Sequence, residues 1–504
     1  MNFKGKLLAI IFGVILIVSG VIRFLHTKNY NTAFTFDQSR DLLDIRALGE
    51  FTDLAVLGPT TSINGLRLGP FYYYINLPAY WLGQGNPQAL VYWNIILFLF
   101  TGAFIFWFFR KKNILLGFLT GVLYLTAPQM FNLTRYYWNA NMATYLSVYY
   151  FLALWNFLDK KNNKSVLYLG ITSALLTQFE AAFGIVCLLF SIVVIVLNKK
   201  TNTWKAFLVG SIPWFLPQIL LEIKNKFQMS KLLLGVFSGS NDVLGERLEI
   251  SESIVSHFET IIKFFEGQFI APPGWGLILL LLSIALIVIN KKYRIKGIYF
   301  ISFIIFAFLF YTAIYHHPLK SWYLESLRVW YCFVVAIGIS NINKFKNLAV
   351  TIIAILLLRN ILLVINDQRQ FIGLKFSDDP KNLNNLLVNI DWVYTKMNGD
   401  GFKAYNYVPE VYDYPNQYLY WWYGNKKYGY MPEKVSYSME EVPEYIRTQE
   451  IFYKNTRPAQ DKLALIYEIK SSYIGWLNQF NDYCTTEKWE TGWRTTVEIR
   501  EKCR

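Results

Sequence analysis

Long apolar blocks alternate with short basic tracts through residues 1–366. Each block runs for roughly 15 to 22 residues, about the length that a helix needs to cross the hydrocarbon core of a bilayer. The blocks on either side of Glu180 are short, so a tight or tilted hairpin is the alternative to two full crossings there. The pattern predicts a polytopic α-helical membrane protein with about eleven transmembrane helices, near residues 7–25, 89–109, 113–128, 141–158, 165–179, 181–197, 205–221, 273–290, 298–315, 326–341 and 347–366.

The basic residues predict which side of the membrane each loop faces. They collect in the short loops on one side, at Lys4, Lys6, Arg110, Lys111, Lys112, Lys160, Lys161, Lys164, Lys199, Lys200, Lys205, Lys291, Lys292, Arg294, Lys296, Lys344 and Lys346. The short loops opposite hold Arg135, Lys320 and Arg328. Because cytoplasmic loops carry the excess of Lys and Arg, the first side is cytoplasmic. We expect a multi-pass protein of the plasma (cytoplasmic) membrane.

The first block has Lys4 and Lys6 before it and Ser19 and Gly20 near its end, which would also suit a cleaved signal peptide. It continues apolar from Val21 to Leu25, which favours an uncleaved anchor. Both interpretations leave the rest of the chain in the same orientation.

Composition supports the membrane class. Hydrophobic residues make up 54% of the chain and charged residues only 16%, fewer than a soluble protein of this length normally carries. The net charge of +15 follows from the cytoplasmic loops. No basic nucleic-acid motif accompanies it, so a nucleic-acid partner is not expected.

Three polar segments are too long to be simple connectors, and the predicted topology places all three outside the cytoplasm. Two of them, 26–88 and 222–270, are large outer loops of a transmembrane domain spanning 1–366, and the third, 367–504, forms an extracytoplasmic α+β domain. Since loops carry function on a rigid scaffold, we expect the chemistry on this face.

The outer domain shows one helix signal and three strand signals. Asp379 and Pro380 open an amphipathic helix that ends at Gly399. Strand-like runs follow at 402–408, 463–469 and 495–499.

Four cysteines divide by location. Cys187 and Cys332 fall in predicted spans, where a small apolar residue is the simple explanation. Cys484 and Cys503 lie in the outer domain and either form a disulfide in an oxidising compartment or remain two free thiols.

Acidic residues follow the first span at once. If residues 35–44 are helical, then Asp37, Asp41 and Asp44 share one face. A carboxylate beside the bilayer is costly unless it is paired or hydrated, which favours a functional role. The simpler alternative is a solvated face of an interfacial helix.

The same loop continues with Gly-Pro pairs at Gly58-Pro59 and Gly69-Pro70 and the aromatic run Tyr72–Tyr74. Gly-Pro pairs fix sharp turns, and the tyrosines suit a membrane interface. A first span, an Asp-bearing loop and then a Gly-Pro-aromatic stretch together resemble the GT-C superfamily, specifically the bacterial relatives of protein mannosyltransferases and of the lipid A aminoarabinose transferase. The resemblance covers roughly residues 10–340 and includes Tyr137–Asn141 and His316–Leu324.

The resemblance implies an inverting glycosyltransferase that uses a polyprenyl-phosphate sugar as donor and an extracytoplasmic glycan, lipid or protein as acceptor. Asp37 matches the family's catalytic base, which would take the acceptor's proton as its oxygen attacks the anomeric carbon. Some relatives have Asp-Glu where this chain has Asp37-Gln38, which puts a second acidic contribution in doubt. The departing phosphate needs positive charge nearby. Arg67 matches in place a basic residue that leads the corresponding Pro-rich stretch in relatives, so it is favoured for this role over Arg40, Arg135, Lys320 and Arg328.

Acceptor or sugar binding is assigned to polar and aromatic residues of the outer loops, namely Asp41, Tyr72, Trp138, Asn139, Glu180, Trp322 and Tyr323. The tyrosine-rich stretch 405–430 is either a further acceptor-binding surface or the core of the outer domain. Glu180, His316, His317 and Asp37 would be enough to bind a divalent metal. Their spacing matches no known motif and the displacement requires no metal, so no metal ligand is assigned.

Two further points remain open from sequence. Arg359 lies in the last predicted span, about 20 Å from its cytoplasmic end at Lys346. It either snorkels to the headgroups or contacts the donor phosphate.

Two classes of protein are the alternatives to a transferase. One is a transporter or flippase of lipid-linked glycans, which should bury polar residues near the bilayer midplane. The other is a non-catalytic envelope assembly protein.

Overall fold

The structure is a computed structural model in which two compact units are defined. It describes residues 3–63, 65–198, 203–238, 247–268, 274–340, 355, 358–359, 361–363, 365–366, 377–408, 412–440, 443, 445–446, 449–468 and 473–504. The first unit comprises Met1–Arg23, Val56–Tyr72 and Asn94–Arg369, and the second comprises Phe24–Ala55, Tyr73–Trp93 and Gln370–Arg504. The expected boundary between 366 and 367 falls beside residues outside this description, so that division stays a prediction.

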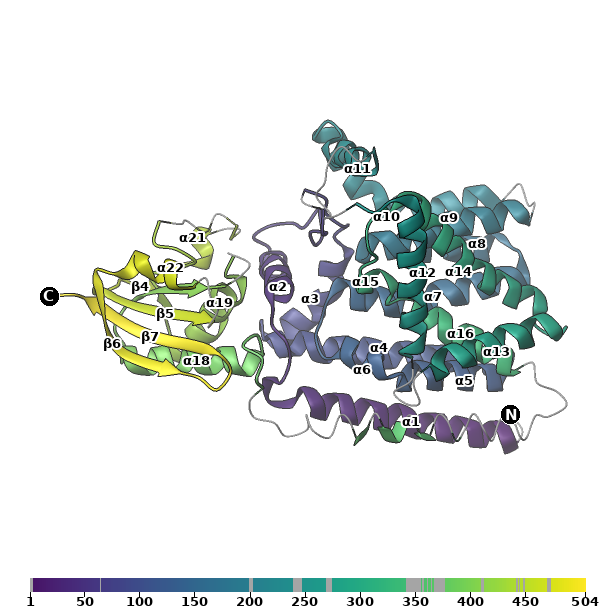
Figure 1. The fold of residues 1–504 in the computed structure, drawn as a ribbon, viewed down its shortest axis with the longest axis horizontal. Helices are drawn as coiled ribbons and strands as arrows, with labels where there is room; N and C mark the ends of the chain where they lie inside the picture. The colour runs from purple at the N-terminus through teal and green to yellow at the C-terminus, as the bar shows by residue number, and fades with distance from the viewer. Residues whose placement is uncertain are drawn as a thin grey trace. The chain divides into compact units, whose positions relative to one another are not determined.

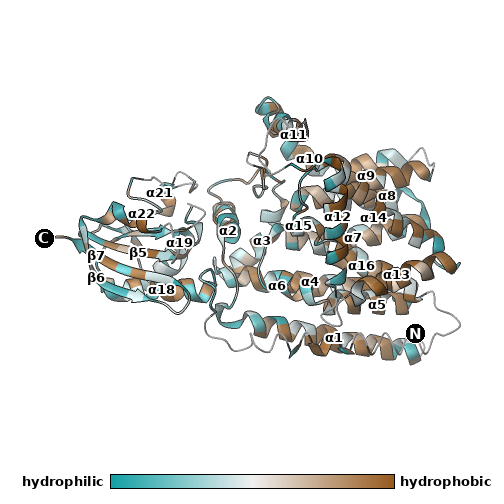
Figure 2. Ribbon diagram, viewed as in Figure 1, coloured by the Kyte–Doolittle hydropathy of each residue, from teal (hydrophilic) through white to brown (hydrophobic). Residues whose placement is uncertain are grey.

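Helices make up the first unit, together with parts of α1 (Phe3–Thr27) and α4 (Pro87–Phe109) (Figure 1). The others are α5 (Ile114–Thr126), α6 (Pro128–Thr134), α7 (Asn139–Lys160), α8 (Asn163–Phe179), α9 (Ala181–Leu197), α10 (Thr203–Lys224), α11 (Gln228–Ser238), α12 (Ile250–Glu266), α13 (Trp275–Ile289), α14 (Arg294–Ile314), α15 (Ser321–Leu324) and α16 (Leu327–Ser340). Figure 2 shows α13 and α14 as largely apolar along their length.

The helices coincide in position with the predicted spans. Within the described residues, five are long and apolar enough to cross a membrane, or six if the bent pair α5–α6 counts as one span. Two shorter apolar helices, α9 and α13, fall below that length. The total of about eleven crossings stays a prediction, and most of the block 347–366, including the surroundings of Arg359, lies outside the described residues.

Glycines allow close helix packing in this unit. A Cβ atom at Gly170 of α8 would lie 2.6 Å from the carbonyl oxygen of Phe207 in α10, and one at Gly210 of α10 would lie 2.5 Å from that of Leu167. Without side chains at these two points, the backbones of α8 and α10 approach directly, as small residues permit in membrane helix pairs.

The second unit contains α2 (Phe36–Gly49), α3 (Phe71–Gly83) and an α+β region. Its further helices are η1 (Lys28–Tyr30), α18 (Leu383–Met397), α19 (Tyr414–Leu419), η2 (Tyr420–Gly424), α20 (Asn425–Tyr428), α21 (Gln449–Phe452), α22 (Tyr473–Leu477) and η3 (Asn478–Phe480). Its strands are β1 (Lys403–Tyr407), β2 (Met431–Pro432), β3 (Lys434–Ser436), β4 (Thr456–Arg457), β5 (Lys462–Glu468), β6 (Tyr483–Glu490) and β7 (Thr495–Lys502).

A five-stranded sheet in the order β3-β1-β5-β7-β6 forms the centre of this region (Figure 1). Strand β1 runs parallel to β3 and β5, whereas β7 is antiparallel to β5 and β6. Tyr405, Leu465 and Phe480 belong to the buried cluster on the α22 side of the sheet. The three predicted strands are therefore confirmed as β1, β5 and β7.

The helix expected from Asp379 begins later, at Leu383, with Asn382 as its cap. The backbone N–H of Phe34 donates to the carbonyl of Lys381 at 2.9 Å, and the N–H of Leu383 donates to that of Thr32 at 2.8 Å. These bonds flank an antiparallel β-bridge between Ala33 and Asn382, so Asn382 has extended backbone and the helix begins only after it. Its end agrees with the prediction, because Asn398 and Gly399 both have positive φ angles, of 51° and 92°.

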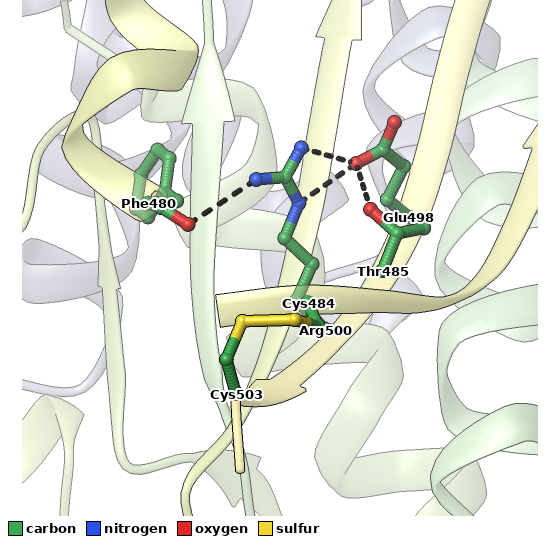
Figure 3. Close-up of a disulfide and its surroundings, with 6 residues drawn as sticks. All are labelled: Phe480, Cys484, Thr485, Glu498, Arg500 and Cys503. Carbon is green, nitrogen blue, oxygen red and sulfur yellow. Dashed lines mark hydrogen bonds and ion pairs between the residues drawn. A yellow bond between two sulfur atoms is a disulfide. The ribbon is translucent and has the colours of Figure 1, made fainter. Parts of the chain in front are cut away.

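The disulfide between Cys484 and Cys503 is formed (Figure 3). It links β6 to the residue after β7, beside an ion pair in which Arg500 contacts Glu498 at 2.7 Å. Cys187 and Cys332 are free and buried, as their places in apolar helices predict.

Candidate functional site

Helix α2 begins beside the candidate base because its first residues form a capping box. Thr35 is the N-cap, and its backbone N–H donates to Oε1 of Gln38 at 3.0 Å. Gln38 is buried and occupied in this cap, which gives it a structural role where some relatives have an acid. Asp37 follows in the first turn, where the helix dipole favours a carboxylate.

Arg40 connects two of the three acids on this helix. Its Nη1 lies 2.9 Å from Oδ1 of Asp37, and its Nη2 and Nε lie 2.7 and 2.9 Å from Oδ1 of Asp41. The Asp37 side chain is 40% exposed, whereas that of Asp41 is fully buried. Arg40, one of the cations considered for the donor phosphate, is therefore held by two carboxylates.

Asp41 lies in the interior of the second unit. Tyr73 donates its hydroxyl to Asp44 at 2.9 Å and to Oδ1 of Asp41 at 3.4 Å. Oδ2 of Asp41 is buried without a hydrogen-bond partner among the described residues. Burial raises the pKa of Asp41 to about 7, and contact with Arg40 keeps it from rising further.

These contacts show that Asp41 does not belong to a solvated face. A solvated interfacial face would leave all three acids in water, but Asp41 is buried and bonded to Arg40 and Tyr73. Because its oxygens are inaccessible, Asp41 does not offer the direct sugar contact assigned from sequence. It positions Arg40, and Asp37 is the accessible carboxylate of the pair.

Helix α2 is anchored to the α+β region of its own unit. Buried Arg46 pairs with Glu50 at 2.7 Å, and its guanidinium lies 5.3 Å from the ring of Trp421 and 4.9 Å from that of Phe452. Helix α19 also packs on α2. The candidate base therefore sits on a helix fixed by aromatic and charged contacts, which restrains its position.

In the first unit, residues 57–63 and 65–69 belong to a narrow loop rather than a simple connector. The N–H of Gly58 donates to the carbonyl of Leu68 at 2.8 Å, and Nε of Arg67 donates to the carbonyl of Gly58 at 3.0 Å. A Cβ atom at Gly58 would clash with the backbone carbonyl of Gly69, and one at Gly69 would clash with the side-chain amide of Gln178. Gly58 therefore has no room for a side chain, and a side chain at Gly69 would have to displace Gln178.

Several assigned residues meet at the break between α8 and α9. Glu180 accepts hydrogen bonds from the N–H groups of Ala182 at 3.3 Å and Phe183 at 2.6 Å, so it caps α9 and divides the two helices. Asn139 donates to the carbonyl of Phe179 at 2.6 Å. The ring of Tyr72 lies 6.2 Å from that of Phe179. All three of these assigned residues are buried, namely Tyr72, Asn139 and Glu180, and each makes one of these contacts within the helical unit.

Short helix α15 brings two more of the assigned residues to α9. The hydroxyl of Tyr323 lies 3.2 Å from Oγ of Ser62 in the narrow loop. Trp322 makes an edge contact with Trp138 at 6.1 Å between ring centroids. These three side chains are only partly buried, so they remain candidates for sugar contact.

The other cations differ in what they contact. Arg328 is buried in a two-point ion pair with Glu325, at 2.6 and 3.1 Å, so its charge is already neutralised. Lys320 is the N-cap of α15, and Arg135 ends α6; both are partly exposed. Among the described residues, no group of three or more His, Cys, Asp or Glu side chains is arranged to hold a metal ion.

Sequence reasoning missed the partners of the acids. Tyr73 was grouped with interfacial tyrosines, yet its hydroxyl contacts Asp41 and Asp44. Arg23, absent from the sequence assignments, is buried in the first unit, where it bonds to Thr134 at 3.1 Å and lies 3.7 Å from the ring of Phe131. An arginine inside an apolar block was the available signal for that contact.

The arrangement of the chain matches solved protein structures, although its sequence has no recognised relative. No protein-family model and no curated protein sequence matches it. The chain shares its fold with solved structures of ArnT, which agrees with the resemblance seen in the sequence. It is similar to ArnT from Cupriavidus metallidurans in the apo state, with a TM-score of 0.57 and 12% identity over 96% of this chain and 97% of that one. The same ArnT bound to undecaprenyl phosphate matches with a TM-score of 0.55 at the same identity and coverage.

Proposed function

We propose that this chain is an inverting glycosyltransferase that moves a sugar from a polyprenyl-phosphate donor to an acceptor outside the cytoplasm. The observation that carries the proposal is Asp37, a half-exposed carboxylate in the first turn of α2 that Arg40 holds at 2.9 Å. The GT-C fold supports the reaction class. One matched ArnT structure holds undecaprenyl phosphate, which supports a polyprenyl-linked donor.

In the proposed reaction, a hydroxyl oxygen of the acceptor forms a bond to the anomeric carbon while the bond from that carbon to the phosphate oxygen breaks. The proton of the hydroxyl passes to Asp37, and the electron pair leaves with the lipid phosphate. Attack from the face opposite the phosphate inverts the configuration. We assign Arg67 to the donor phosphate, since a charged hydrogen-bond donor stabilises the negative charge that develops there. The proposed displacement needs no metal.

The direct test uses the full-length protein in lipid vesicles. Undecaprenyl-phosphate sugars carrying a radiolabel are supplied one at a time, together with a membrane extract as the source of acceptors. We expect one donor to lose its label to an acceptor, with release of undecaprenyl phosphate. If every donor stays intact but labelled lipid changes leaflet, the protein is a flippase and the transferase proposal is wrong.

The orientation needs its own test, because the extracytoplasmic placement of the α+β region rests on the distribution of basic residues. A cysteine introduced at Asn425 should react with a membrane-impermeant maleimide in intact cells, whereas one at Asn162 should react only after lysis. Both side chains belong to helix ends with polar neighbours. The reverse pattern would place Asp37 on the cytoplasmic side and overturn the proposed topology.

A further inference from the structure

Two carboxylates share one guanidinium at the start of α2. Arg40 lies between Asp37 and Asp41, and its nitrogens are 2.9 Å from Oδ1 of Asp37 and 2.7 and 2.9 Å from Oδ1 of Asp41. The Arg40 side chain is only 10% exposed, so water and salt screen these charges weakly. A change in the charge of Asp41 therefore changes how much of the positive charge of Arg40 acts on Asp37.

The two oxygens of Asp41 have different surroundings. Oδ1 accepts hydrogen bonds from Arg40 and from the hydroxyl of Tyr73, the latter at 3.4 Å. Oδ2 is buried and has no hydrogen-bond partner among the described residues. An ionised carboxylate in this condition is costly, because one of the two oxygens that share its charge is removed from water without a donor. Oδ2 is the oxygen on which a proton would remove that charge.

Three charged groups of the same helix and one hydroxyl of α3 face Asp41, namely Arg40, Asp37, Asp44 and Tyr73. Arg40 favours the ionised form of Asp41, whereas the two other acids oppose it. Burial has the largest effect and raises the pKa of Asp41 to about 7. This carboxyl therefore gains or loses its proton near neutral pH.

Helix α19 also packs on α2 and carries two tyrosines. The ring of Tyr414 contacts that of Phe36 at 4.9 Å between centroids, and the ring of Tyr418 contacts that of Phe34 at 6.0 Å. The main influences on the pKa of Asp41 are burial and the charges of α2, not these rings.

We propose that Asp41 is a positioning residue whose proton controls the catalytic base. With Asp41 ionised, Arg40 is shared between two negative charges, so less of its charge offsets that of Asp37, and the base takes the acceptor's proton more readily. With Asp41 neutral, the charge of Arg40 acts wholly on Asp37 and weakens it as a base. Asp41 exchanges its own proton with water and takes no part in the bond changes. The inference rests on the proposed function, because Asp37 is a base only in a transferase.

The test compares the pH dependence of transfer by the full-length protein and by Asp41→Asn, in the vesicle assay with labelled undecaprenyl-phosphate sugars. We expect the unmodified protein to transfer sugar about three- to tenfold faster at pH 8 than at pH 6. Asparagine keeps the size of the side chain and an oxygen for Arg40, but it cannot ionise. The rate of Asp41→Asn should therefore equal that of the unmodified protein at pH 6 and stay at that level at pH 8, with the difference in kcat and not in KM for the donor.

Infrared difference spectroscopy of the purified protein gives a second measurement that needs no donor. The carbonyl stretch of a protonated carboxyl should grow in the unmodified protein as the pH falls from 8 to 6, and this change should be missing in Asp41→Asn. Tyr73→Phe removes a hydrogen-bond donor to the ionised form of Asp41. In that variant, both the infrared change and the change in rate should move to higher pH.

Asp391→Asn is the matched control. Asp391 is likewise held by a lysine and by tyrosines, with Lys427 at 2.8 Å and Tyr423 and Tyr428 at 3.0 and 2.7 Å, but it lies on α18. This control should keep the pH dependence of the unmodified protein. A merely structural Asp41 would make the rate of Asp41→Asn fall by the same factor at both pH values. That result, or an infrared change that persists in Asp41→Asn, would overturn the inference.

The two proposals fail in different ways. If sugar is transferred with the same pH dependence by the unmodified protein and by Asp41→Asn, this inference is wrong and the transferase proposal stands. If no donor is consumed at either pH, the transferase proposal is wrong, and the inference fails with it even where the infrared spectra show a proton on Asp41.

Discussion

Asp37→Asn is expected to lower the rate of sugar transfer by about 10² to 10⁴. The amide keeps the size of the carboxylate, and its oxygen can still accept a hydrogen bond from Arg40, which lies 2.9 Å from the native side chain. It cannot take the proton of the acceptor hydroxyl. The loss should therefore appear in turnover in lipid vesicles, while binding of undecaprenyl phosphate and the thermal unfolding midpoint stay close to those of the unmodified protein.

Asp53→Asn is the matched control for this variant. It makes the same chemical change in the same unit, a few residues beyond the end of α2 at Gly49. Transfer by this control should remain near normal. If Asp37→Asn also retained near-normal transfer, the proton would be taken elsewhere and the proposed mechanism would have to be abandoned.

The helices of the first unit could be predicted because a membrane span is set by local composition. Blocks such as 89–109 and 205–221 lie within α4 and α10, since every backbone polar group in the bilayer must be satisfied within its own helix. Strand β6 could not be predicted in this way. Residues 483–490 are charged and mostly exposed, so they lack the alternation that marks a half-buried strand, and they pair only because β7 provides an edge.

The candidate site could be predicted from the sequence only in part, for a related reason. The position of Asp37 after the first span is a local feature, and it was found. The burial of Asp41 depends on Tyr73, which lies 32 positions further along the chain. The spacing of residues along the sequence does not reveal which distant side chains come into contact. The assignments of Asp41 to sugar and Arg40 to phosphate therefore treated as exposed two side chains that are buried and bonded to each other.

Arg40→Met is expected to destabilise the protein by about 1 to 2 kcal/mol at pH 8, because Asp41 loses its partner and must take up a proton to avoid being a buried, unpaired charge. Methionine fills much of the same volume, so the loss would report on charge more than on packing. Tryptophan fluorescence during thermal unfolding in detergent measures the change. Adding Asp41→Asn to Arg40→Met should recover most of the stability, since the double variant buries a neutral amide. No recovery would mean that Arg40 acts mainly through Asp37 or the Phe36 ring, which lies 5.6 Å away.

The dependence of this loss on pH identifies the group responsible. Burial raises the pKa of Asp41 to about 7 in the folded chain, against about 3.9 for an unfolded aspartate. The folded state therefore keeps a proton that the unfolded state has released. The contribution of Asp41 to stability is fully present below about pH 4 and is lost as the pH rises through 7, by an amount on the order of 4 kcal/mol.

The cost of the variant should follow the same dependence on pH. At pH 5 Asp41 is neutral with or without Arg40, so Arg40→Met should cost little stability there. At pH 8 the native carboxylate is ionised and depends on Arg40, so the cost should be larger, by about 1.4 kcal/mol, the free energy of protonating a group of pKa about 7 at that pH. An equal cost at both pH values would exclude the charge on Asp41 as the cause.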